Sequence, residues 1–167
     1  VTGRNLKIFD SLIASGKQLS PRMQYYYARE LAANGKTQKA IEIFTEFLRH
    51  GQGWSVNNIE AARELSRCYQ KLGKPNDALK SAFMAFLYGV PTAEILCLIG
   101  ELFLSIGKIT QAAYWYKLAT QCQIDSNNLG FVEKDYYDYI PYLQLCIIYY
   151  KLDDVQQARH YNDLAGK

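Results

Sequence analysis

A motif that occurs four times along the chain constrains its fold more than any other feature of the sequence. The four copies align on a small residue, and these anchors are Ala40, Ala78, Ala112 and Ala158. Five residues before each anchor stands a turn residue: Gly35, Gly73, Gly107 and Asp153. Nine and thirteen residues before each anchor stand large apolar or aromatic side chains, with a small residue at twelve. This spacing predicts a helix with one apolar face. The helix ends at the glycine, because glycine readily adopts the left-handed conformation.

Each copy therefore predicts a helix–turn–helix unit, with the alanine placed where the second helix crosses the first. The pattern resembles the tetratricopeptide repeat, whose period is about 34 residues. The anchors are 38, 34 and 46 residues apart, so the resemblance implies insertions of 4 and 12 residues, in Gly51–Asn58 and Ile124–Asp138. The expected fold class is all-α, a tetratricopeptide-like α-solenoid.

We predict one repeat domain over residues 1–167, made of an N-terminal half repeat and four helix–turn–helix repeats. The half repeat is 1–20, the repeats are 21–55, 56–91, 92–123 and 139–167, and the insertion is 124–138. Helices are expected over residues 4–14, 21–34, 37–49, 56–72, 75–88, 92–106, 109–121, 139–152 and 155–165.

The half repeat lacks its first helix, because residues 6–13 align with residues 41–48 of a complete unit. A second helix without its first leaves an apolar face uncovered. We therefore expect an upstream segment or a partner to cover Ile8, Phe9 and Leu12, and we interpret the chain as the C-terminal part of a longer protein.

Composition and charge narrow the function classes. With 49% hydrophobic residues and a net charge of +3, whole-chain disorder is excluded. The most apolar stretch, residues 95–106, falls short of the roughly 20 residues of a membrane span. Residues 1–90 carry 13 basic and 7 acidic residues, whereas residues 91–167 carry 6 and 9. The basic half can steer an acidic partner, although a chance distribution of solvated charges explains the same counts.

No catalytic or metal-binding motif is recognisable. The four cysteines are widely spaced without a Cys-x-x-Cys pair, and His50 and His160 fall in different repeats. A phosphate-binding loop and a nucleophile elbow are missing. We expect no catalytic residue, cofactor or metal within these residues, and we expect a cytoplasmic location with reduced thiols.

The first helices of the repeats are expected to line a concave binding face. The main candidates on it are Arg22, Tyr25, Tyr26, Arg29, Glu60, Arg63, Arg67 and Glu101. Further positions in the same register are Glu64, Glu94, Cys97, Leu143, Ile147 and Tyr150. Arginine and tyrosine are enriched at binding hot spots, so a groove with these arginines can hold an acidic or phosphorylated segment. Alternatively, the arginines pair with glutamates on adjacent helical turns.

Aromatic residues mark both insertions, and the candidates are Trp54, Phe131, Tyr136 and Tyr137. A connection as long as residues 124–138 is uncommon inside a repeat domain and is often functional. Its rings can stack on a sugar or anchor a protein partner. In the other interpretation, Phe131 and Tyr137 pack back into the seam between the third and fourth repeats.

Two stretches of the chain carry a more specific resemblance. The sequence over residues 19–31, with Gly53-Trp54 and Asn57-Asn58, is similar to the repeat region behind the catalytic domain of bacterial family-2 glycosyltransferases. So are residues 130–132, Asp135-Tyr136 and residues 140–146. The resemblance implies an upstream transferase domain that uses a nucleotide-sugar donor and a divalent metal, with none of its catalytic residues in this chain.

This resemblance makes the chain a non-catalytic module that binds a protein or an acceptor, dimerises, or braces the enzyme. The alternative is a free-standing adaptor that binds a peptide in its concave groove. Expected partners are a protein or peptide, the upstream catalytic domain, or a second copy of the chain. We do not expect nucleic acid, for which the basic half with its tyrosines is the only support.

Overall fold

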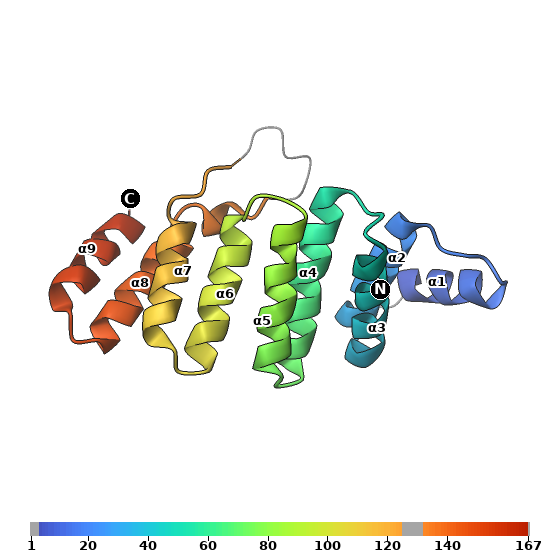
Figure 1. Ribbon diagram of the computed structural model, residues 1–167, viewed down its shortest axis with the longest axis horizontal. Helices are drawn as coiled ribbons and strands as arrows, with labels where there is room; N and C mark the ends of the chain where they lie inside the picture. The colour runs from blue at the N-terminus through green and yellow to red at the C-terminus, as the bar shows by residue number, and fades with distance from the viewer. Residues whose placement is uncertain (1–3, 125–131, 167) are drawn as a thin grey trace. The chain divides into compact units, whose positions relative to one another are not determined.

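The computed structural model describes residues 4–124 and 132–166, and these residues are helical wherever they are regular (Figure 1). Its α-helices are α1 (Arg4–Ala14), α2 (Pro21–Ala33), α3 (Thr37–His50), α4 (Ser55–Lys71), α5 (Pro75–Met84), α6 (Ala93–Ser105), α7 (Ile109–Ala119), α8 (Ile140–Lys151) and α9 (Val155–Ala165). Two short 3-10 helices are η1 (Ala85–Leu87) and η2 (Lys134–Tyr136).

The expected helices are confirmed, and their ends agree within two residues in all but one case. The helix expected over residues 75–88 is α-helical only to Met84 and continues as the 3-10 helix η1. There the Tyr88 N–H donates to the Ala85 carbonyl at 3.1 Å. Tightening of the last turn in this way is common at helix ends.

The chain divides into two compact parts, up to Gly89 and from Val90 onward, which we describe separately. In the first part, α2 packs on α3, α3 on α4 and α4 on α5, with α1 against α2. Its largest fully buried side chains are Tyr27, Leu31, Phe44 and Phe47. The anchors Ala40 and Ala78 are fully buried as well, so close helix crossings at small residues hold this part together.

In the second part, α6 packs on α7, α7 on α8 and α8 on α9. Gly100 shows why a small residue is needed twelve positions before the anchor. A Cβ atom placed there would lie 2.7 Å from the ring of Tyr116 on α7. The anchors Ala112 and Ala158 are again buried, at 0% and 5% exposure.

The turns inside the four helix–turn–helix units share one geometry. Their turn residues all have a positive φ: 76° at Gly35, 67° at Gly73, 74° at Gly107 and 58° at Asp153. In each turn, the N–H of the following residue donates to the carbonyl five positions earlier, at 2.9–3.0 Å. This closes the preceding helix as in a Schellman motif. Asp153 therefore replaces glycine without changing the turn, and aspartate is one of the few residues that tolerates this conformation.

Helix α1 packs on α2 through one side only. Leu6 is buried, and the Phe9 ring lies 5.5 Å from that of Tyr27. The Tyr27 hydroxyl donates to Asp10 Oδ1 at 3.0 Å. Ile8 remains 51% exposed, so the expectation that something covers this face stays a prediction.

Candidate functional site

Four side chains of α2 form a continuous row, which we call the α2 ladder: Arg22, Tyr26, Tyr25 and Arg29. The Arg22 guanidinium lies 5.8 Å from the centre of the Tyr26 ring, and that of Arg29 lies 5.6 Å from the centre of the Tyr25 ring. The two rings are 5.2 Å apart. Each arginine is one helical turn from its tyrosine, so the helix itself brings the cation–π pairs together.

Tyr25 anchors the ladder in the core. Its side chain is 4% exposed, and its ring lies 5.9 Å from Phe47 and 6.5 Å from Phe44, both on α3. Burial raises the pKa of Tyr25 to about 12, an effect that Arg29 opposes and Glu60 reinforces. The phenol is therefore neutral at physiological pH and presents its ring to the guanidinium.

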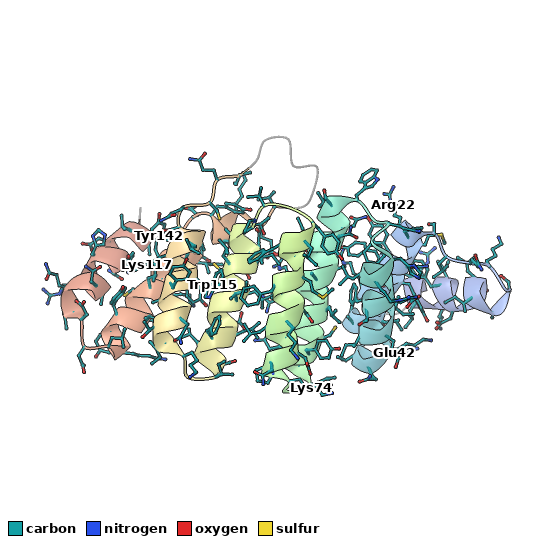
Figure 2. All side chains as sticks on the ribbon, viewed as in Figure 1. Arg22, Glu42, Lys74, Trp115, Lys117 and Tyr142 are labelled. Carbon is teal, nitrogen blue, oxygen red and sulfur yellow. The ribbon has the colours of Figure 1, made fainter. Side chains whose placement is uncertain are left out.

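The ladder arginines have no carboxylate within ion-pair distance in the part of the chain that the structure describes, and both are exposed. Arg49 on α3 shows the opposite situation, because its guanidinium donates to both oxygens of Glu46, at 2.7 and 3.1 Å. Hydrogen bonds from Arg49 and His50 lower the pKa of Glu46 to about 2. Arg22 and Arg29 thus keep their full charge available to a ligand. In Figure 2, Arg22 lies near the upper ends of the helices of this part, and Lys74 lies at their lower ends.

Helix α4 contributes charges of both signs. Arg63 is buried and its Nη1 lies 3.5 Å from Glu60 Oε2, so for this residue the pairing alternative is correct. The carboxylates of Glu60 and Glu64 act on Tyr25, which places them toward α2. Arg67 is half-buried on the same helix. The candidate site therefore has exposed guanidiniums along α2 and carboxylates along α4.

The remaining face positions lie in the second part of the chain and differ in character. Glu101 is half-buried on α6, and Cys97 is buried. Along α8, Leu143, Ile147 and Tyr150 are 40%, 39% and 72% exposed. These residues form an apolar stripe rather than a charged one.

Glu94 is the residue whose role the sequence did not reveal. It is 4% exposed in the first turn of α6 and accepts two hydrogen bonds, from the Glu133 N–H at 3.2 Å and the Tyr137 hydroxyl at 3.0 Å. Burial and the Glu94 carboxylate raise the pKa of Tyr137. A carboxylate followed directly by the apolar run 95–99 signals a buried acid, but the sequence does not name its partners.

The insertion candidates fall into three situations. Tyr137 packs back onto α6, as the packing interpretation has it, and the half-buried Tyr136 lies in η2, which contacts α6 and α8. Phe131 lies outside the described residues. Trp54 is 71% exposed just before α4. A binding role for these residues stays a prediction.

Within residues 4–124 and 132–166, no group of three or more histidine, cysteine, aspartate or glutamate side chains is arranged to hold a metal ion. The four cysteines are free thiols. None of the described helices combines the length and apolar character that crossing a membrane requires.

No protein-family model matches the chain, and no curated protein matches it in sequence. Solved structures match its fold. BtubC (BKLC) from P. vanneervenii gives a TM-score of 0.75 at 15% identity, over 98% of this chain and 72% of that one. A putative kinesin light chain from Podosopora anserina with nearly identical TPR-like repeats gives 0.67 at 14% identity, over 96% and 83%. YrrB, a TPR protein with an unusual peptide-binding site, gives 0.54 at 9% identity, over 87% and 84%.

These matches confirm the expected fold class, an all-α tetratricopeptide-like α-solenoid. At such low identities they establish the fold alone. Function has to be argued from the residues of this chain.

Proposed function

We propose that this chain is a protein-interaction module that binds an acidic peptide segment on the α2 ladder. The observation that carries the proposal is the pair of exposed arginines, Arg22 and Arg29, held against tyrosine rings without a carboxylate partner. Stacking on a ring restricts a guanidinium before a ligand arrives, which lowers the entropy cost of binding. A planar guanidinium also binds a carboxylate through two parallel hydrogen bonds.

The surroundings of the ladder favour a peptide over a small anion. Exposed tyrosine next to arginine supplies apolar contact area beside charge, the combination typical of binding hot spots. Tyr26 is 40% exposed between the two arginines. Glu60 and Glu64 on α4 repel a ligand that is negative throughout, so the segment should carry its carboxylates on the side that meets α2. The peptide-binding site of YrrB, a protein of similar fold, supports a peptide as the ligand.

Fluorescence anisotropy with labelled short peptides tests the proposal. Three randomised sets of equal length are compared, in which the charged positions are acidic, amide or basic. We expect the chain to select the acidic set and the binding to weaken with added salt, because exposed charges are screened. Replacing both ladder arginines (Arg22→Gln and Arg29→Gln) should lower the affinity about tenfold or more, since each charge-assisted hydrogen bond contributes ~1.5–3 kcal/mol.

Arg49→Gln is the matched control, because Arg49 is also exposed but is already paired with Glu46. It should leave the affinity unchanged. Equal binding of the three peptide sets, or equal affinity of the double variant and the original chain, would show that the ladder does not bind acidic segments.

We also propose, as the wider setting of this module, the glycosyltransferase parent that the insertion motifs imply. Its support is the motif resemblance described above, in residues 19–31, Gly53-Trp54, Asn57-Asn58, residues 130–132, Asp135-Tyr136 and residues 140–146. A free-standing adaptor fits the fold equally well. The complete reading frame distinguishes them. A transferase-like segment upstream of this region supports the parent enzyme, and a different upstream sequence supports the adaptor.

A further inference from the structure

A pocket of about 310 Å³ lies beside the amino end of α2 and includes none of the ladder residues. The loop between α1 and α2, the start of α2, and the end of α3 with its following loop converge on it. Its lining residues are Gln18, Leu19, Pro21, Gln24, Phe47, His50 and Gln52. Its volume is at the lower end of the ~300–1,000 Å³ found for small-molecule sites.

The polar lining of this pocket is made of neutral carboxamides. The Gln24 Nε2 donates to the Leu19 carbonyl at 3.1 Å, which fixes that amide and leaves its oxygen free to accept. Gln18 and Gln52 have no side-chain hydrogen bond to any residue that the structure describes. Each therefore offers both donors and an acceptor to a ligand. The imidazole Nε2 of His50 lies 2.7 Å from Glu46 Oε1, so the one ionisable lining group is already paired.

An exposed indole follows this polar lining closely in the sequence. Trp54 is 71% exposed and follows Gln52 by two residues. The loop between them is held down on the pocket wall, because a Cβ on Gly53 would lie 2.4 Å from the Phe47 ring. The Asn58 Nδ2 also donates to the Gly53 carbonyl at 3.1 Å. The short loop that joins the pocket residue Gln52 to Trp54 is thus fixed in place.

We propose that this pocket binds a neutral carbohydrate, with one sugar ring held by the three glutamines and Trp54 at its border. Neighbouring hydroxyls of a sugar need a donor and an acceptor side by side, and a carboxamide supplies both. The apolar side chains of Leu19 and Pro21 suit the C–H faces of the ring. The negative face of an indole attracts the slightly positive C–H groups of a sugar. The site is separate from the α2 ladder, so this inference goes beyond the proposed peptide binding.

The shape of the pocket favours a ring over an extended peptide. A peptide in extended conformation advances about 3.3 Å per residue and needs a track along which its backbone can run. Here three segments of chain converge on one compact space instead. A charged ligand is disfavoured as well, because the lining offers no unpaired charge.

Saturation-transfer difference NMR on the chain tests the proposal, with glucose, galactose, mannose, N-acetylglucosamine and cellobiose as probes. We expect at least one of them to bind. Removing two amides (Gln18→Ala with Gln52→Ala) should weaken that binding about tenfold, since two hydrogen bonds of ~0.5–1.5 kcal/mol each are lost. Gln38→Ala is the matched control, because Gln38 is an exposed glutamine on α3 outside the pocket. It should leave the affinity for the sugar unchanged. The fluorescence of Trp54 in a Trp115→Phe variant should shift on addition of the same sugar, because these are the two tryptophans of the chain.

Three results would overturn the inference. One is that none of the five sugars binds, and another is that binding survives the double glutamine variant. The third is that the neutral peptide fragment N-acetyl-glutaminamide binds more tightly than every sugar, which would assign the pocket to a peptide. Peptide binding at the α2 ladder should be unchanged in the double glutamine variant, so failure here and failure of the ladder proposal are distinguishable.

Discussion

The first helices of the repeats keep one register in both parts of the chain but present different chemistry there. The position eleven residues before the anchor holds Arg29, Arg67, Glu101 and Ile147 in successive repeats. The position fifteen before it holds Tyr25, Arg63, Cys97 and Leu143. The face is basic and aromatic along α2, whereas along α8 it is apolar and lacks charge at these two positions.

This difference separates the positions whose residue type is fixed by helix packing from the positions whose residue type can vary. The anchor and the positions twelve and thirteen before it keep their small or apolar character in every copy, because a changed volume there is costly. The positions eleven and fifteen before the anchor change their chemistry from repeat to repeat, and Arg29 and Ile147 at the first of them can do so without disturbing the packing because both are exposed. The residues of the α2 ladder are therefore available for selection by a ligand, and the comparison yields three tests of stability.

The largest effect is expected at the position four residues after the anchor, which is Phe44 in the first repeat and Asn162 in the last. Phe44 is fully buried and Asn162 is exposed. Phe44→Ala should lower the free energy of unfolding by roughly 3–5 kcal/mol through the cavity it leaves. Asn162→Ala should change it by no more than about 0.5 kcal/mol. Urea denaturation of the two variants measures both values, and similar losses would contradict the burial of this position in the first repeat and its exposure in the last.

A smaller effect is expected at alkaline pH from Tyr25, which is 4% exposed while Leu143 at the same register is 40% exposed. Burial raises the pKa of Tyr25 from 10.0 to about 12, so the folded chain holds this proton more tightly than the unfolded chain does. The resulting stability is complete below pH 10 and is lost as the pH rises toward 12. It is roughly 3 kcal/mol at most, at about 1.4 kcal/mol per pH unit.

Denaturation curves measured between pH 8 and pH 12 test this effect. Tyr25→Phe should reduce the loss of stability at alkaline pH. Tyr150→Phe should not reduce it, because the Tyr150 side chain on α8 is exposed. An identical pH dependence in both variants would mean that Tyr25 titrates like an exposed tyrosine.

The helices and turns were predictable from the sequence because their causes are local. The anchors, the small residues and the glycines each act within one unit, and even Asp153 adopts the turn that its position requires. The pairing of charges was not predictable, since an arginine on a helix has several partners within reach. Arg63 pairs with Glu60, whereas Arg29 lies over Tyr25.

Contacts between distant segments were beyond the reach of the sequence pattern. Glu94 bonds residues 39 and 43 positions away, which lie within the insertion. The glutamine-lined pocket likewise combines the α1–α2 loop with the end of α3. The repeat pattern does not predict such contacts, because they depend on how a loop without a repeat pattern folds back onto the helices.

The smallest effect compares Arg29 with Ile147, which share one register on α2 and α8. Ile147→Gln should be nearly neutral, because Ile147 is already 39% exposed. Arg29→Gln should cost about 0.5–1 kcal/mol if the guanidinium is held by the Tyr25 ring, the usual range for an exposed cation–π pair. A double-mutant cycle with Tyr25→Leu isolates this contribution, because without the ring the arginine substitution should cost nothing. If Arg29→Gln is as neutral as Ile147→Gln, the guanidinium is not held in place. The ladder would then bind acidic segments no better than any other exposed pair of arginines.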